Sequence, residues 1–112
     1  MTFKPFDVVE LPFPFSDLSN AKKRKALVIS SKHFNEANKA VTVAMITSRI
    51  SSEWIGDVSI VQWALAGLKK PCYVRLKFFT ADISIFTGKV GELDHSDQKN
   101  VIASYKSNLL TF

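Results

Sequence analysis

Short runs of apolar, β-branched residues alternate with polar turns along most of the chain, and this pattern predicts a protein built mainly of β-strands. Pro12 and Pro14 lack the amide hydrogen that a strand ladder needs, so the first strand is expected to end near them. The apolar run after Lys25 is dense enough to predict burial on both faces of its strand. The predicted strands are Asp7–Leu11 (DVVEL), Lys25–Ser31 (KALVISS), Val41–Ser48 (VTVAMITS), Asp57–Gln62 (DVSIVQ) and Tyr73–Phe79 (YVRLKFF), with Ile83–Val90 expected to pair with the last of them.

One long helix is predicted, near the C-terminal end. Asp94 is a suitable N-cap, and Asp97 falls in the first turn, where a carboxylate interacts favourably with the helix dipole. Four apolar residues recur at helical spacing and are expected to share one face: Val101, Ile102, Tyr105 and Leu109. The segment Lys32–Lys39 is either one helical turn or a loop. These elements predict a small, strongly bent antiparallel sheet or barrel closed by a late helix.

The composition fits one globular domain covering residues 1–112, with 46% hydrophobic and 22% charged residues. No stretch approaches the roughly 18 uninterrupted apolar residues of a membrane-spanning helix, so no membrane partner is expected. The first ten residues lack the apolar run of a signal peptide. Because Cys72 is the only cysteine, no intramolecular disulfide can form. We therefore expect a cytoplasmic location.

The net charge of +5 is unevenly distributed. Residues 1–50 hold 8 Lys or Arg against 4 Asp or Glu, whereas residues 51–112 hold 7 against 6. Four consecutive cations stand directly before the second strand: Lys22, Lys23, Arg24 and Lys25. A basic surplus favours a polyanion such as nucleic acid, or an acidic protein partner. The alternative interpretation is a turn whose cations are simply solvated.

Metal and cofactor chemistry is not expected from this sequence. His33, His95 and Cys72 lack the close spacing of metal ligands, and no glycine-rich phosphate loop is present. Cys72 is expected to be a small buried residue of the core. The strand Tyr73–Phe79 alternates so as to predict a half-buried strand with a basic outer face. The candidate functional side chains are therefore cations and hydroxyls: Arg24, Thr47, Ser48, Arg49 and Arg75.

An ordered set of segments runs through the chain: DVVELPFPFSDLSNAKKRKALVIS, VTVAMITS, GDVSI, AGLKKPCYVRLKFFTAD and GELDHSD before the final helix. In this order the segments resemble the MazF/PemK family, which comprises ribosome-independent endoribonuclease toxins of type II toxin–antitoxin modules. The resemblance implies an SH3-like antiparallel β-barrel of the CcdB/PemK type with a C-terminal α-helix. It also implies a homodimer that binds single-stranded RNA in grooves at its interface.

The implied activity is sequence-selective, metal-independent cleavage of single-stranded mRNA by the ribose 2′-hydroxyl, leaving 2′,3′-cyclic phosphate and 5′-hydroxyl ends. By resemblance, Arg24 is the catalytic arginine and Thr47 its hydroxyl partner near the phosphate. Arginine suits this role because its planar fork grips two phosphate oxygens and stays charged. The expected RNA-binding residues are Ser48, Arg75, Lys77, Lys22, Lys23, Lys25 and Arg49. A cognate antitoxin with a disordered acidic segment is expected to fold over the same basic groove.

Three positions depart from the family pattern. Phe6 stands where glycine usually precedes the acid of the first strand, Lys25 where proline usually follows the arginine, and Lys77 where one branch has an aspartate. Two alternatives therefore stay open: a CcdB-like toxin that binds DNA gyrase without cutting, and an inactive nucleic-acid-binding barrel. Phe13 and Phe15 are expected to pack in the core or a dimer interface, with base stacking as the alternative.

Overall fold

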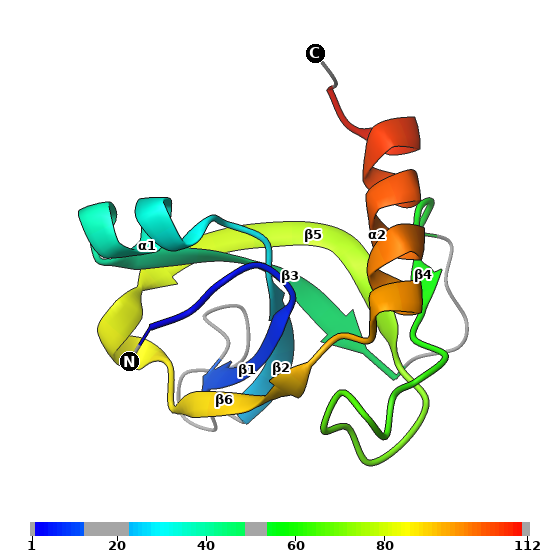
Figure 1. The fold of residues 1–112 in the computed structure, drawn as a ribbon, viewed down its shortest axis with the longest axis horizontal. Helices are drawn as coiled ribbons and strands as arrows, with labels where there is room; N and C mark the ends of the chain where they lie inside the picture. Colours follow the sequence, from blue (N-terminus) through cyan, green and yellow to red (C-terminus); the bar gives the residue numbers. More distant parts are fainter. Residues whose placement is uncertain (1, 13–22, 49–53, 111–112) are drawn as a thin grey trace.

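The computed structural model describes residues 2–12, 23–48 and 54–110 of the chain (Figure 1). It contains a six-stranded antiparallel sheet, a short helix between the second and third strands and a longer helix near the C-terminal end. The prediction of a mainly β, antiparallel fold with a late helix is confirmed. The elements in chain order are β1 (Asp7–Pro12), β2 (Lys23–Val28), α1 (Lys32–Asn38), β3 (Ala40–Thr47), β4 (Val58–Ser59), β5 (Tyr73–Asp82), the 3-10 helix η2 (Ile83–Ile85), β6 (Gly88–Glu92) and α2 (His95–Asn108).

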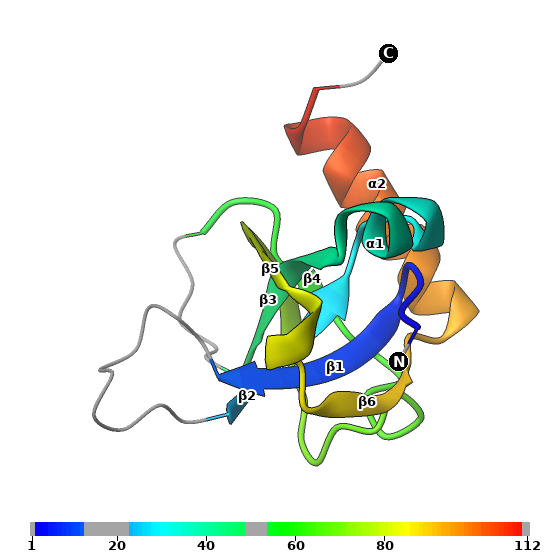
Figure 2. The ribbon, with the colours of Figure 1, turned by 90° about the vertical axis from the view of Figure 1, so that its left-hand side faces the viewer.

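The strands lie in the order β4-β5-β3-β2-β1-β6, and all neighbouring pairs are antiparallel. Figures 1 and 2 show how the sheet curls, with β5 arching over one side and β1, β2 and β6 on the other. The expectation that Ile83–Val90 pairs with β5 is wrong, because β6 pairs with β1 instead. The physical reason is the end of β5, where the Asp82 carboxylate accepts the Ser84 amide at 2.9 Å and caps η2. This short helix turns the chain away from β5 before β6 begins.

Apolar side chains pack in two clusters, one on each face of the sheet. Successive strand residues point to opposite faces, so Leu27 joins the cluster beneath α2 while Ala26 and Val28 join the cluster inside the curl. In that second cluster the rings of Phe3 and Phe86 meet with centroids 5.5 Å apart. Ala26, Leu27 and Val28 are each 0% exposed, which confirms the predicted burial of the apolar run of β2 on both faces.

The long segment between β4 and β5, residues 60–72, is fastened to the rest of the fold at two places. Asp97, buried in the first turn of α2, accepts hydrogen bonds from the amides of Val61 and Gln62, each at 2.9 Å. These amides bond to Asp97 rather than to β5, which is why β4 is shorter than the predicted strand Asp57–Gln62. Gly67 has φ +83°, and a Cβ there would come within 2.2 Å of the β6 backbone. Gly91 on β6 makes the same contact from the other side, since its Cβ would come within 2.3 Å of the loop backbone.

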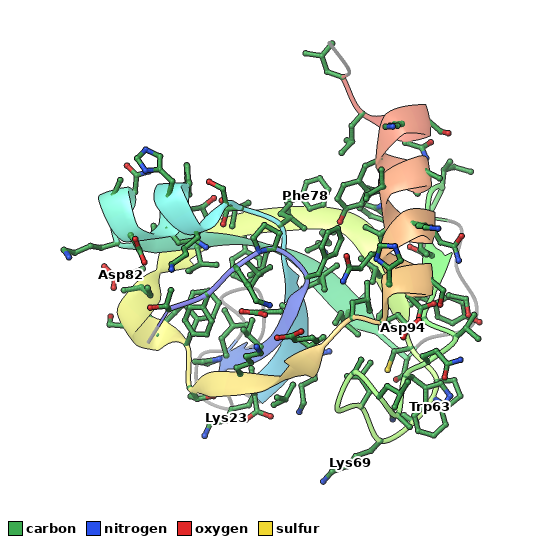
Figure 3. All side chains as sticks on the ribbon, in the orientation of Figure 1. Lys23, Trp63, Lys69, Phe78, Asp82 and Asp94 are labelled. Atoms are coloured by element: carbon green, nitrogen blue, oxygen red, sulfur yellow. The ribbon has the colours of Figure 1, made fainter. Side chains whose placement is uncertain are left out.

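Helix α2 begins where the sequence predicts, and Asp94 is its N-cap. The Asp94 carboxylate accepts the Ser96 amide at 3.1 Å. Val101 is buried in the cluster beneath the helix, and Tyr105 packs against that cluster. Figure 3 shows Phe78 of β5 on the side of α2, and its ring meets the Tyr105 ring edge-on with centroids 5.6 Å apart.

Two residues expected on the buried face of α2 lie outside it. Ile102 is 42% exposed and Leu109 is 40% exposed. Ile102 follows Val101 directly, and one helical residue rotates the side chain by about 100° away from the buried face. Leu109 is the C-cap and has extended backbone angles, so the helical spacing no longer applies to it. Among the residues described, no helix is long and apolar enough to cross a membrane.

Phe6, directly before β1, adopts φ +71°, in the left-handed region that residues with side chains rarely occupy. Its amide donates to a β2 carbonyl at 2.8 Å, and its carbonyl accepts the amide of Leu93 at 2.9 Å. The strained angle is therefore held by backbone hydrogen bonds on both sides. The glycine that the family resemblance leads one to expect here would adopt this angle without strain.

An ion network surrounds Asp7 at the start of β1. Its carboxylate is 1% exposed, and it accepts the Lys4 amide at 3.0 Å and the Lys4 ammonium at 2.9 Å. The Lys89 ammonium lies 3.2 Å from the same carboxylate. Both lysines also pair with Glu92, at 2.9 Å and 2.6 Å. Lys89 and Lys4 together lower the pKa of Glu92 to about 2.

Candidate functional site

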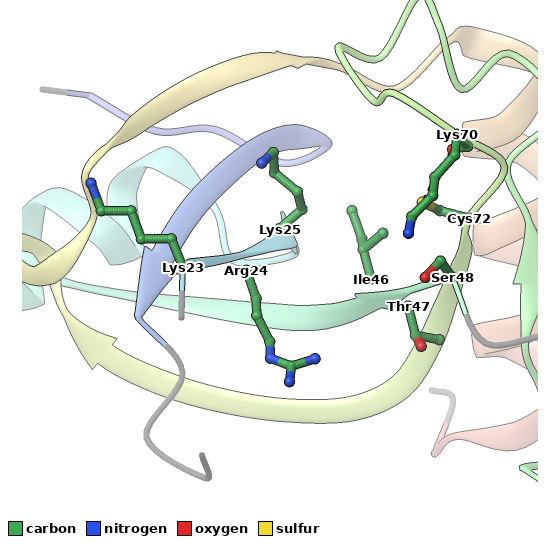
Figure 4. Close-up of a pocket in the computed structure, with 8 residues that line it drawn as sticks. All are labelled: Lys23, Arg24, Lys25, Ile46, Thr47, Ser48, Lys70 and Cys72. Atoms are coloured by element: carbon green, nitrogen blue, oxygen red, sulfur yellow. Dashed lines mark hydrogen bonds between the residues drawn. The ribbon is translucent and has the colours of Figure 1, made fainter. Parts of the chain in front are cut away.

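A cavity of about 280 Å³ opens at the end of the sheet where β2 begins and β3 ends (Figure 4). It brings together five of the side chains that the sequence singled out, although they come from two different strands. Three further residues, which the sequence analysis did not propose as site residues, complete the lining. The residues that line it are Lys23, Arg24, Lys25, Ile46, Thr47, Ser48, Lys70 and Cys72.

Arg24 and Thr47 leave the sheet on the same side. The β2–β3 register pairs Ala26 with Met45, and Arg24 and Thr47 each lie two residues closer to the open end. Because side chains two residues apart share a face, the register places Arg24 and Thr47 on one face of adjacent strands. Figure 4 shows both side chains pointing away from the side on which Lys25 lies. Thr47 is 9% exposed, whereas Arg24 is exposed at the rim.

Lys25 is paired within the protein. Its ammonium lies 2.6 Å from the carboxylate of Glu10, its cross-strand neighbour on β1. This hydrogen bond lowers the pKa of Glu10 below its usual range. Lys25 is thus a structural partner as well as part of the cavity wall.

The other cations of the cavity have no such partner among the described residues. Within residues 2–12, 23–48 and 54–110, no carboxylate lies within ion-pair distance of Lys23, Arg24 or Lys70. Lys23, Arg24 and Lys70 thus line one opening together with Thr47 and Ser48, although Figure 4 shows their charged groups pointing in different directions around it. Cations and hydroxyls without a carboxylate are the groups that bind phosphate oxygens.

Lys70 and Cys72 enter the cavity from the segment between β4 and β5, and sequence reasoning did not place Lys70 there. Figure 4 shows the Lys70 ammonium directed toward the end of β3 near Ser48. The Cys72 thiol is buried, as expected, and donates to the Lys70 carbonyl at 3.3 Å. Burial raises the pKa of this thiol, while the charges of Lys70 and Lys25 act in the opposite direction. No local signal in the GLKKP stretch of residues 67–71 reveals which strand it approaches.

Arg75 and Lys77, the predicted RNA-binding residues of β5, do not line this cavity. The Arg75 guanidinium makes a two-pronged ion pair with Asp57, with Nε at 3.1 Å and one terminal nitrogen at 3.0 Å from the carboxylate oxygens. Its side chain is only 14% exposed, so the predicted basic outer face is in part an internal ion pair. Both cations lie near the ring of Trp54, 5.7 Å and 5.8 Å from its centroid.

Five residues named by the sequence analysis lie outside the described part of the chain: Phe13, Pro14, Phe15, Lys22 and Arg49. Their expected roles stay predictions. Among the residues that are described, no three His, Cys, Asp or Glu side chains gather as a metal site would require.

Comparison with known protein families gives one match. The profile of the family described as "PemK-like, MazF-like toxin of type II toxin-antitoxin system" matches residues 4–107. A search of the curated proteins gave no match.

The fold is similar to that of solved MazF toxins. The Mycobacterium tuberculosis toxin MazF-mt6 superposes with a TM-score of 0.74 at 18% identity, covering 94% of this chain and 99% of that one. A MazE–MazF complex from Deinococcus radiodurans gives a TM-score of 0.75 at 17% identity, covering 96% and 95% of the two chains. An endoribonuclease from a mycobacterial species, solved with its cognate antitoxin, gives 0.71 at 10% identity, covering 99% and 98%. At these identities the likeness concerns the fold, which is mainly β with a curled antiparallel sheet.

Proposed function

Because the chain belongs to the family of PemK-like, MazF-like toxins of type II toxin–antitoxin systems, we propose that it is a metal-independent, sequence-selective endoribonuclease acting on single-stranded mRNA. The observation that carries this proposal is the cavity at the open end of β2 and β3. It combines Arg24 and Thr47 on one face with cations that have no carboxylate partner among the described residues. A phosphodiester would supply the missing negative charge.

In the proposed reaction the ribose 2′-oxygen attacks the neighbouring phosphorus while its proton passes to a base. The bond from phosphorus to the 5′-oxygen then breaks, and that oxygen takes up a proton. The products are a 2′,3′-cyclic phosphate and a 5′-hydroxyl end, so atoms and charges balance without a metal or a cofactor. The enzyme must stabilise the negative charge that develops on the phosphorane oxygens in the transition state.

The residues of the cavity divide this work between them. The Arg24 guanidinium remains charged and holds two phosphate oxygens through its planar fork. The Thr47 and Ser48 hydroxyls, at the end of β3, donate hydrogen bonds to the same phosphate group. Lys23 and Lys70 raise the positive potential at the opening and attract the RNA backbone. These assignments extend the family membership to individual residues of this chain.

The same basic opening supports a proposal for the partner that restrains the toxin. An antitoxin with a disordered, acidic segment would place carboxylates against Lys23, Arg24 and Lys70 and so compete with RNA. The Deinococcus and mycobacterial structures include an antitoxin, which favours a partner of this class. We extend the proposal to a cytoplasmic homodimer, as in the family resemblance.

The test is incubation of the purified protein with a defined single-stranded RNA in the presence of EDTA, followed by mapping of both new ends. We expect cyclic phosphate and 5′-hydroxyl ends at a restricted set of sequences. Arg24→Ala should lower the cleavage rate by about 10²- to 10³-fold, the usual effect of removing one group that stabilises transition-state charge. Lys99→Ala, which removes an exposed cation from α2, is the matched control and should cleave normally.

Two outcomes would overturn the proposal. If Arg24→Ala cleaves as fast as the unmodified protein, the cavity is not the site of reaction. If the unmodified protein leaves all RNA sequences intact, a non-catalytic role replaces it. Gyrase supercoiling inhibition would then indicate a CcdB-like toxin, and salt-dependent RNA binding without cleavage would indicate a binding barrel.

A further inference from the structure

Trp54, just before β4, is a large aromatic side chain held in a fixed position at the surface. The indole is 45% exposed, yet its Nε1 donates a hydrogen bond to the Leu76 carbonyl at 3.1 Å. Because β4 pairs with β5 only at Val74 and Tyr73, the Leu76 carbonyl lies beyond that ladder, where the indole meets it. The ring is thus attached to the edge of β5.

Two cations of β5 flank this ring. The Arg75 guanidinium carbon lies 5.7 Å from the ring centroid and the Lys77 ammonium 5.8 Å, both within the range of cation–π attraction. Arg75 is itself fixed by its two-pronged pair with Asp57. The aromatic surface is therefore pre-organised, and Lys77, an exposed residue, gives its surroundings a positive charge.

This aromatic surface belongs to the same face of the sheet as Arg24 and Thr47. Thr47 pairs directly with Tyr73 on β5, and Arg75 lies two residues further along that strand. The β3–β5 register shifts between Ala44 and Ile46, where the four residue steps from Val74 to Phe78 face two steps on β3. Because the surplus is even, alternation keeps Arg75 and Lys77 on the face on which Thr47 lies. Two strand residues span about 7 Å and the step from β3 to β5 about 5 Å, so Arg75 lies roughly 9 Å from Thr47, within reach of a nearby nucleotide of the same RNA strand.

From this arrangement we infer that Trp54 is a stacking platform for one base of the RNA strand whose phosphate is bound at Arg24, with Lys77 contacting the backbone beside that base. The inference rests on the proposed function and adds a base-binding subsite to it. An aromatic ring can stack on any base, and neighbouring cations favour the adjoining phosphate. An extended single strand, rather than a duplex, exposes bases in the way this subsite requires.

The first experiment measures binding without cleavage. The probe is a fluorescein-labelled oligoribonucleotide containing a sequence that the unmodified protein cuts, with a 2′-deoxy sugar at the cut position. We expect Trp54→Leu to weaken its binding by roughly 5- to 150-fold, the range for loss of one base stack, and Trp54→Phe to retain most of the affinity. Phe34→Leu is the matched control, since Phe34 on α1 is 39% exposed and should bind normally when replaced.

The second experiment separates stacking from a structural effect. Single abasic sites are placed at successive positions of the probe, and each oligonucleotide is measured with the unmodified protein and with Trp54→Leu. At one position the missing base should remove the difference between the two proteins. An equal difference at every position, or normal binding by Trp54→Leu, would overturn the inference. So would a Trp54→Leu variant that binds RNA normally but no longer binds an acidic antitoxin peptide, since the surface would then serve the protein partner.

Failure of the proposed function looks different. In that case the unmodified protein cuts no RNA, so no probe sequence can be chosen and the inference falls with the function. A Trp54→Leu variant with normal cleavage and binding, by contrast, leaves the function in place and removes only the subsite.

Discussion

The two ends of β1 carry the same kinds of charged side chain and use them in opposite ways. At the Asp7 end, Lys4 and Lys89 meet the carboxylates of Asp7 and Glu92 at distances of 2.6–3.2 Å. At the Pro12 end, the neighbouring β2 residues Lys23 and Arg24 open onto a cavity that they share with Lys70. Of the cations that line this cavity, Lys25 has a carboxylate partner, Glu10, and the others have none among the described residues.

This difference separates cations that hold the fold from cations available to a ligand. Like charges gathered without counter-ions repel one another and lower the stability of the folded state. Such a cluster is retained where a polyanion provides the missing charge on binding. A lysine of either end looks the same in the sequence, so only the folded arrangement distinguishes the two uses.

The largest effect on stability is expected from Asp7→Ala, which removes the buried carboxylate at the Asp7 end of β1. The change leaves the Lys4 amide and two ammonium groups without their buried acceptor, and should lower the free energy of unfolding by about 3 kcal/mol. Urea denaturation measures this loss. RNA cleavage per folded molecule should be unchanged, which is the reverse of the result expected for Arg24→Ala.

The control for this variant is Glu36→Ala, which removes an exposed carboxylate that lies 4.0 Å from Lys32 on α1. Glu36→Ala should lower the free energy of unfolding by about 0.5 kcal/mol or less, as for other exposed ion pairs on helices. Equal losses in the two variants would show that the Asp7 network does not stabilise the fold more than a surface ion pair does.

A smaller effect is expected at the cavity end from Lys70→Ala. Removing one phosphate contact should weaken binding of the uncleavable RNA about fivefold and reduce the slope of log affinity against log salt concentration by about 0.7. The neighbouring Lys69→Ala is the control, since Lys69 is exposed but does not line the cavity (Figures 3 and 4). Equal salt slopes for the two variants would contradict the role given to Lys70.

The smallest effect is the pH dependence of stability that comes from the Glu92 ion pairs at the Asp7 end of β1. The pKa of Glu92 is lowered from its ordinary value of 4.5 to about 2, so its ion pairs contribute stability that is complete above pH 4.5 and is lost as pH falls toward 2. The difference in unfolding free energy between the unmodified protein and Glu92→Gln should therefore be constant above pH 4.5 and shrink below it. Because Glu92 is exposed, high salt should reduce this difference. A difference that does not change with pH would exclude an ionic origin.

Local features of the fold could be predicted from the sequence because their causes are local. The apolar run of β2 and the Asp94 cap of α2 depend on neighbouring residues, and both predictions are confirmed. The partner of β6 could not be predicted, since a short strand pattern contains no information about which edge it joins. The exposure of Ile102 likewise depends on how α2 is rotated against the sheet, which the helical spacing alone leaves open.

The candidate site was predictable only in part, for the same reason. Arg24 and Thr47 were candidates from residue type, and the family resemblance implied their catalytic roles. The structure places both at one cavity, while these roles stay predictions. The Arg75–Asp57 pair joins residues 18 positions apart, so the sequence shows two unrelated charges instead of one ion pair. Lys70 reaches the cavity on a loop that is fastened elsewhere, by the backbone contacts at Gly67 and Gly91 and by the hydrogen bonds to Asp97.

The backbone contact between Gly67 and Gly91 allows the side chain at one wall of the cavity, that of Lys70, to be replaced. The loop is fastened by main-chain atoms and by Asp97, so the side chain of Lys70 is not needed to hold it in place. Residue 70 can therefore change without rebuilding the scaffold, and under the proposed function such a change would alter which RNA sequences bind. The glycines cannot vary in this way, because any side chain at either position would enter the opposing backbone. Under the proposed function, we therefore expect related toxins to keep both glycines and to vary at the position of Lys70.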